Sequence, residues 1–105
     1  MEGKELGITV KDKNKEKVEI AVSGRLDTTT APELEKVILG YIRDGITELA
    51  LDIEELEYIS SAGLRVMLIS QKEIRDKGKM YLENVRPEVY EVFEITGFTD
   101  IITII

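Results

Sequence analysis

The chain has 105 residues, 43% of them hydrophobic and 33% charged, so its length allows one compact domain with an apolar core. Its formal net charge of −7 argues against a nucleic-acid-binding protein, which needs clustered Lys and Arg, and fits either a partner with a basic surface or simply a well-solvated domain. No segment approaches the roughly 20 apolar residues of a membrane span, residues 1–5 lack the apolar run of a secretory signal, and cysteine is absent, which together predict a cytoplasmic location.

The N-terminal part has the pattern of a β-hairpin. A strand is expected over residues 7–10, and Val18, Ile20 and Val22 alternate with less apolar residues, as in a strand with one buried face. The polar residues 12–16 between these runs predict a turn. The two strands should therefore pair antiparallel.

A first amphipathic helix is expected after the turn that follows the hairpin. Thr30, Pro32 and Glu33 combine a capping residue, an early proline and a carboxylate three positions past the cap. One apolar stripe follows at helical spacing and ends near residues 44–45, and its members are Leu34, Val37, Ile38, Tyr41 and Ile42. This helix should cover one face of a sheet.

A buried strand and a second helix are expected in the middle of the chain. Residues 49–53 form a short apolar run that is typical of a central strand with both faces covered. Ser60 or Ser61 should then cap a helix whose first half is apolar nearly all round. Gly78 predicts a left-handed stop at its end.

The last part of the sequence predicts a strand, a short helix and a final strand. Residues 80–82 form the first strand, Pro87 opens the helix and Gly97 ends it. Ile and Thr dominate residues 101–105, which favours a terminal strand. The order ββαβαβαβ implies an α/β fold with a mixed sheet, right-handed crossovers and helices on its faces.

The residue types exclude most common catalytic sites. Histidine is absent, so a Ser-His-Asp triad cannot form, and no phosphate-binding loop or nucleophile elbow occurs among the glycines. Glu54, Glu55 and Glu57 could hold magnesium, although a solvated loop is the favoured interpretation because nothing there fixes an octahedral geometry. We expect no enzyme, no cofactor and no metal.

Four polar residues should gather at one edge of the sheet. Asp27, Thr28, Ser60 and Ser61 follow strands, and sites in such sheets lie where strand carboxyl ends meet helix N-termini. A phosphate on Ser61 would face unpaired amides and a favourable helix dipole. The alternative is that both serines only cap the helix, and spacing alone favours capping.

Several motifs in this order resemble the STAS domain of bacterial anti-sigma factor antagonists. They are Gly24-Arg25-Leu26-Asp27, Thr30-Ala31, the apolar run that ends at Asp52, and residues 58–64, so the resemblance makes residues 1–105 a single STAS domain. It implies that Ser61 is the phosphorylated serine, with Ser60 at the position of a family aspartate and Asp27 at the turn aspartate. The implied partner-binding residues are Asp27, Thr28, Ser60, Ser61, Ala62, Gly63 and Arg65.

The resemblance also implies a function in transcription regulation. The unphosphorylated protein would bind an anti-sigma factor that is a serine kinase, and so release a sigma factor. The kinase would reverse this by phosphorylating Ser61, and a metal-dependent serine phosphatase would restore the active form. ATP and catalysis would thus belong to the partners.

Two departures from the family pattern and two alternative functions stay open. Ser60 replaces the aspartate that precedes the phosphorylated serine in many antagonists. The sequence given stops at Ile105, so the final family helix is expected to be absent, and the apolar surface left bare suggests a homodimer. The alternatives are a constitutive STAS scaffold or transporter accessory subunit, and an enzyme that hydrolyses nucleotides with Asp27 and Ser61.

Overall fold

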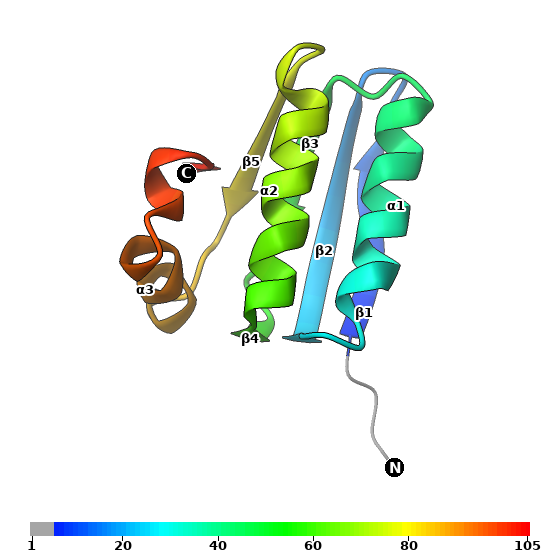
Figure 1. The fold of residues 1–105 in the computed structure, drawn as a ribbon. Helices are drawn as coiled ribbons and strands as arrows, with labels where there is room; N and C mark the ends of the chain where they lie inside the picture. The colour runs from blue at the N-terminus through cyan, green and yellow to red at the C-terminus, as the bar shows by residue number, and fades with distance from the viewer. Residues whose placement is uncertain (1–5) are drawn as a thin grey trace.

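A six-stranded sheet organises the fold, and two long helices lie side by side across one of its faces (Figure 1). The computed structural model describes residues 6–105, so the segment considered for a secretory signal lies outside the described residues. The elements in chain order are β1 (Leu6–Lys13), β2 (Lys17–Leu26), α1 (Ala31–Arg43), β3 (Glu48–Asp52), β4 (Leu56–Ile59), α2 (Ser61–Arg75), β5 (Lys79–Glu83), α3 (Pro87–Ile95), the 3-10 helix η1 (Phe98–Asp100) and β6 (Thr103–Ile104).

The sheet is mixed, as the sequence predicts. Its strand order is β1-β2-β3-β5-β6, with β4 paired to β2 off this path. β1 and β2 form the expected antiparallel hairpin, and every other pairing is parallel. The apolar run of β3 lies between β2 and β5, with Leu49, Ala50 and Leu51 fully buried.

The strand β4 is absent from the predicted element order, which becomes ββαββαβαβ in the structure. The long strand β2 pairs with β3 along residues 17–21 and with β4 along residues 24–26. Only Leu56 and Ile59 of β4 are buried, and the two residues between them are exposed. Two apolar positions three residues apart do not produce the alternation that identifies a strand, so the sequence analysis missed it.

Helix α1 confirms the predicted apolar stripe and its end. Leu34, Ile38 and Ile42 are buried in the core, and the other two stripe residues pack against it. The helix ends at Arg43 with Asp44 as its C-cap, and Gly45 follows with φ of +106°, a conformation that strains other residues.

Gly78 does not serve as the predicted left-handed stop. It is not among the residues with positive φ in the described chain, and α2 instead ends at Arg75 with Asp76 as its C-cap. A Cβ on Gly78 would lie 1.7 Å from the carbonyl oxygen of Thr47. The glycine is therefore required because the backbone before β3 passes against the backbone before β5.

The C-terminal part follows the prediction except in the length of its last strand. Helix α3 starts at Pro87, buries Val89 and Phe93, and is followed by Gly97 with φ of +80°. Residues 98–100 form a 3-10 helix, so β6 is limited to two residues, which pair with β5. Ile95, Ile101 and Ile105 are exposed, and the homodimer stays a prediction.

Within residues 6–105, every helix is too short or too polar to cross a membrane.

Candidate functional site

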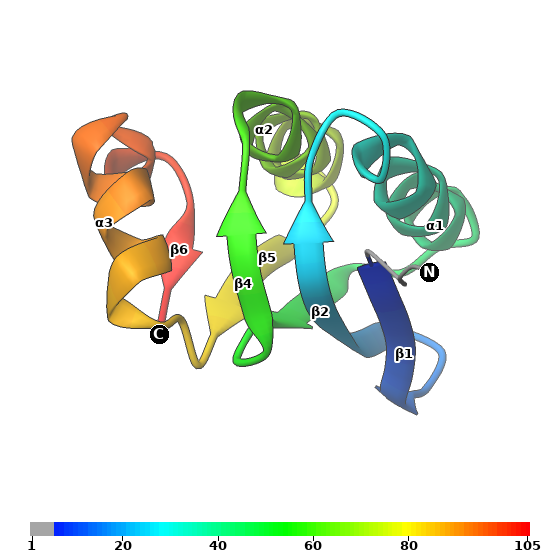
Figure 2. The same ribbon diagram turned by 90° about the horizontal axis from the view of Figure 1, so that it is seen from below.

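The carboxyl ends of β2 and β4 lie next to each other, and each strand leads into the N-terminus of a helix (Figure 2). Leu26 and Ile59 are register partners, and the Ser60 amide donates a hydrogen bond to the Leu26 carbonyl at 2.9 Å. Asp27 and Ser60 directly follow these paired residues. The predicted meeting of the two segments at one edge of the sheet is confirmed.

The Asp27 carboxylate organises the turn between β2 and α1. Its Oδ1 accepts hydrogen bonds from the Thr29 hydroxyl at 2.8 Å, the Thr29 amide at 3.0 Å and the Thr30 amide at 3.2 Å. These bonds, the one from the Thr29 hydroxyl foremost, lower the pKa of Asp27. The turn therefore carries a fixed negative charge at neutral pH.

Thr30 occupies the N-cap position of α1 as predicted, but its hydroxyl does not cap the helix. The side chain is buried, where its oxygen accepts a hydrogen bond from the Asp27 amide at 2.9 Å and donates one to the Arg25 carbonyl at 2.8 Å. Thr30 thus ties the end of β2 to the start of α1, so the predicted helix start is confirmed and the side-chain cap is not made.

Ser60 occupies the N-cap position of α2, and Ser61 is the first residue of the helix. The Ser60 backbone is extended, with φ of −97° and ψ of 178°, yet its side chain makes no capping hydrogen bond. Its Oγ is buried without a hydrogen-bond partner among residues 6–105, whereas Ser61 is exposed. The prediction that a serine caps α2 holds for the position of Ser60 only.

The first turn of α2 presents unpaired amides beside Ser61. The first helical hydrogen bond runs from the Leu64 amide to the Ser60 carbonyl at 3.0 Å. The amides of residues 61–63 precede it and have no acceptor within the helix. They give this edge a partial positive charge next to an exposed hydroxyl.

Gly63 is buried where the first turn of α2 packs against the ends of β2 and β4. A Cβ at this position would lie 2.8 Å from side-chain carbons of both Ile59 and Leu26. The absent side chain thus allows the first turn of α2 to rest on the paired ends of β2 and β4. Its contribution to the predicted partner surface is therefore indirect.

A small hollow of about 190 Å³ between the N-termini of α1 and α2 brings other predicted residues together. Thr28, Ala62 and Arg65 line it, and Glu35 lies on the α1 side. Thr28 and Arg65 are exposed, and Ala62 is half-buried. The hollow thus brings Thr28 together with Ala62 and Arg65 between the two helix starts.

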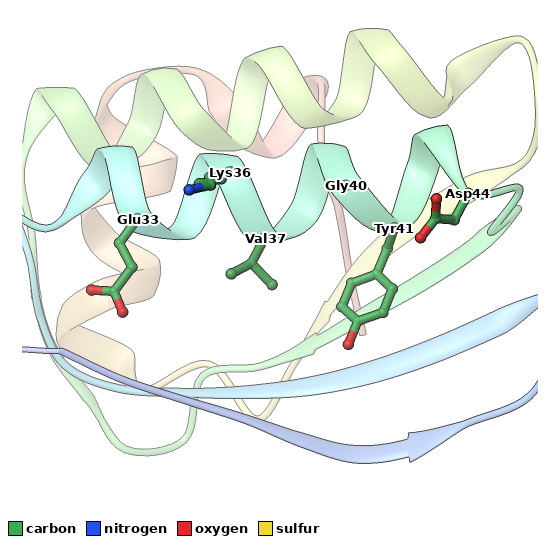
Figure 3. Close-up of a pocket in the computed structure, with 6 residues that line it drawn as sticks. All are labelled: Glu33, Lys36, Val37, Gly40, Tyr41 and Asp44. Atoms are coloured by element: carbon green, nitrogen blue, oxygen red, sulfur yellow. The ribbon is translucent and has the colours of Figure 1, made fainter.

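A larger hollow of about 510 Å³ lies along α1 and contains none of the predicted site residues (Figure 3). Glu33, Lys36, Val37, Gly40, Tyr41 and Asp44 line it, all from this one region of the chain. The side chains of Glu33, Val37 and Tyr41 point away from the helix axis in the same direction.

The acidic loop considered for magnesium makes other contacts. An Arg86 Nη atom lies 3.6 Å from a carboxylate oxygen of Glu55, and Arg86 Nε donates a hydrogen bond to the Glu54 carbonyl at 2.6 Å. Among residues 6–105, no three acidic side chains converge as metal ligands would.

The pair formed by Arg25 and Tyr58 lies at the same edge and was not among the predicted site residues. The two are register partners on β2 and β4, and the guanidinium carbon of Arg25 lies 4.2 Å from the centroid of the Tyr58 ring. Recognition of β4 as a strand is the signal that could have revealed this pair, because the pairing depends on the register between β2 and β4.

A comparison with known families identifies the fold. Residues 9–105, which are most of the chain, match the model of the STAS domain. The chain belongs to the STAS-domain family. This agrees with the observed mixed sheet and three α-helices, and it confirms the predicted fold class.

Two curated relatives of this STAS-domain protein are named as anti-sigma factor antagonists. The putative anti-sigma factor antagonist BtrV of Bordetella bronchiseptica is 40% identical over 81 residues, which are 76% of this chain and 70% of BtrV. The anti-sigma-B factor antagonist of Listeria monocytogenes is 32% identical over 101 residues, which are 94% of this chain and 88% of the relative. These relatives confirm the predicted antagonist family.

The structure is also similar to that of the anti-sigma factor antagonist SpoIIAA. The unphosphorylated form has a TM-score of 0.82 at 24% identity, over 94% of this chain and 88% of SpoIIAA. The phosphorylated form of SpoIIAA from Bacillus has a TM-score of 0.74 at 21% identity, over 94% and 91%. At this identity the similarity concerns the fold.

Proposed function

We propose that this STAS domain is an anti-sigma factor antagonist that binds a serine-kinase anti-sigma factor through the edge around Ser61 and thereby releases a sigma factor. Phosphorylation of Ser61 by that kinase would end the interaction, and a serine phosphatase would restore it. The names of the curated relatives support the regulatory class. The observation that supports Ser61 as the phosphorylated residue is its exposed position in the first turn of α2, next to residues that the fold holds in place.

The surroundings of Ser61 suit a phosphorylated serine better than a capping serine. The N-cap position belongs to Ser60, so Ser61 has no capping task that would explain a hydroxyl there. The unpaired amides of residues 61–63 favour negative charge at this end of the helix. A phosphate could be added without unfolding the first turn. SpoIIAA, which shares the fold, has been solved in a phosphorylated form.

A phosphate on Ser61 would oppose binding by its charge. It adds about −1.5 to −2 charges to an edge where Asp27 is already ionised. A partner that docks there would have to desolvate this dianion, and a loss of about 1.4 kcal/mol already weakens binding tenfold. In this scheme the chain is a substrate and a ligand, and its partners bind ATP and carry out the catalysis. We therefore expect it to act in the cytoplasm, where transcription is regulated.

Intact-protein mass spectrometry after incubation with magnesium-ATP and the serine-kinase anti-sigma factors of the source organism tests the phosphorylated residue. We expect one added phosphate on the wild type and on Ser60→Ala, and none on Ser61→Ala. Ser60→Ala is the matched control because it removes the neighbouring hydroxyl and leaves Ser61. Phosphate that persists in Ser61→Ala would contradict the proposed site.

Titration calorimetry with the same kinase tests the switch. Ser61→Asp should bind more weakly than wild type, whereas Ser61→Ala should bind with similar affinity because it adds no charge. Equal affinities of wild type and Ser61→Asp would refute the phosphoswitch. A kinase that binds the chain without ever modifying it would instead indicate a constitutive scaffold.

A further inference from the structure

Arg25 and Tyr58 form a stacked pair on the face of the sheet opposite α1 and α2. Leu26 and Ile59, the next residues on each strand, are buried in the core, so the alternation of side chains directs Arg25 and Tyr58 to the other face. The Arg25 side chain is 53% exposed and Tyr58 is 41% exposed. The pair is thus an ordered feature of the surface.

The Arg25 guanidinium has only a loose contact with an acidic side chain in the described part of the chain. The ion pair of Arg25 is a 3.9 Å approach of its Nε to Asp27 Oδ2, which is too long for a strong hydrogen bond. Stacking on an aromatic ring fixes the plane of a guanidinium and leaves its outer N–H groups free to bind a carboxylate with two hydrogen bonds.

The pair lies close enough to Ser61 to share one interface with it. Ser61 is three positions after Tyr58 in the chain, so their Cα atoms are at most roughly 11 Å apart. Arg25 lies beside Tyr58 across the strand pair, about 5 Å away. A partner that buries about 800 Å² of this chain covers a disc of roughly 16 Å radius. A partner that docks over the strand ends between Ser61 and the pair is therefore wide enough to contact both.

We propose that the Arg25–Tyr58 pair is a specificity-determining contact for the anti-sigma factor that binds around Ser61. The inference rests on the proposed function and adds a statement about the partner, which presents a carboxylate to Arg25 and apolar surface to the Tyr58 ring. A carboxylate is required because an interface that buries the free edge of a guanidinium without an acceptor leaves a charge unpaired. Tyr and Arg are also the residue types that most often dominate binding energy in interfaces.

The pair contributes to the fold only modestly, which makes the inference testable. An exposed cation–π contact stabilises a protein by about 0.5–1 kcal/mol, so variants that lose it should stay folded. Binding and stability can therefore be measured separately on the same proteins.

The experiment is titration calorimetry with a recombinant serine-kinase anti-sigma factor of the source organism, with thermal melting of each variant as the folding control. Tyr58→Ala and Arg25→Ala should each raise the Kd by about tenfold, as loss of a central Tyr or Arg does. Arg25→Glu should raise it further because it opposes the partner carboxylate.

Two variants serve as controls. Tyr58→Phe keeps the ring and should bind within about twofold of wild type. Arg75→Ala removes another exposed arginine, at the other end of α2 and about 21 Å from Ser61 along the helix, and should not change the Kd.

The outcomes separate this inference from the proposed function. Unchanged affinity of Tyr58→Ala and Arg25→Ala, together with weaker binding of Ser61→Asp, would refute the role of the pair alone. Tighter binding of Arg25→Glu would refute the acidic partner surface. If the wild type binds no such kinase, the proposed function fails and this inference fails with it.

Discussion

The close approach of α2 to the sheet at Gly63 leads to a prediction about a single methyl group. Gly63→Ala places a Cβ at 2.8 Å from Ile59 Cγ1, 2.8 Å from Leu26 Cγ and 2.9 Å from Leu26 Cδ2. All three carbons belong to fully or almost fully buried side chains, so none can move into solvent. The first turn of α2 must therefore shift away from the ends of β2 and β4.

The magnitude follows from two opposing terms. Alanine in a helix is favoured over glycine by up to about 1 kcal/mol. Inserting an extra carbon into a packed core costs about 1–3 kcal/mol. We therefore expect Gly63→Ala to lower the free energy of unfolding by about 1 kcal/mol, although its helix propensity improves.

Gly40→Ala is the matched control, because it lies in α1 and a Cβ there would meet no atom within 4 Å. Only the propensity term acts at this position, so we expect Gly40→Ala to raise the free energy of unfolding by about 0.5–1 kcal/mol. Urea denaturation of both variants and the wild type measures the two changes. A Gly63→Ala protein as stable as Gly40→Ala would refute the packing role of Gly63.

Two further predictions concern polar side chains. Burial raises the pKa of Asp52, but hydrogen bonds from Lys11, the Glu54 amide and Asn84 lower it more, so the folded pKa lies below the usual value. The ionised Asp52 therefore stabilises the fold at pH values above its unfolded pKa of about 3.9, and this stability is lost as the pH falls through the folded pKa. Asp52→Asn should thus cost about 1–3 kcal/mol in urea denaturation at pH 7 and clearly less at pH 3, and an equal cost at both would contradict the ionic role. Thr30→Ala should lower the free energy of unfolding by about 1–2 kcal/mol because it removes two hydrogen bonds of a buried hydroxyl. Ser60→Ala should lower it by less than about 0.5 kcal/mol because the Ser60 hydroxyl makes no hydrogen bond within residues 6–105. Equal losses in the same denaturation assay would contradict this difference between the two N-caps.

The helices could be predicted because several local signals agree at each of them. For α1, proline, an acidic first turn, the apolar stripe and the closing glycine all indicate the same boundaries. Strand β4 lacks such agreement, because it is four residues long and its partner is the far end of β2. The sequence indicated that Gly78 matters at the end of α2, but it did not reveal why a glycine is needed there. The close approach of Gly78 to Thr47 depends on packing between segments that are distant in sequence.

The site could be predicted at the level of position, because strand order alone brings Asp27 and Ser60 to one edge. The hydrogen bonds could not be predicted. Thr30 and Ser60 both have the sequence signature of a cap. The Thr30 hydroxyl bonds to β2 and the turn that follows it, whereas the Ser60 hydroxyl is buried with no partner in the described part of the chain. Which way a hydroxyl turns depends on the surrounding fold, and that information is not local.

The uncapped start of α2 bears on how the proposed switch would act. An N-cap hydroxyl ordinarily contributes about 1 kcal/mol by accepting one of the first amides, and Ser60 does not make that bond. In the proposed phosphorylated form, the charge on Ser61 would stand beside amides that no side chain already occupies. Negative charge at a helix N-terminus stabilises it by about 0.3–1 kcal/mol at an exposed position. The phosphate would then leave the fold at least as stable as before, so its whole effect would fall on the partner that docks at this edge.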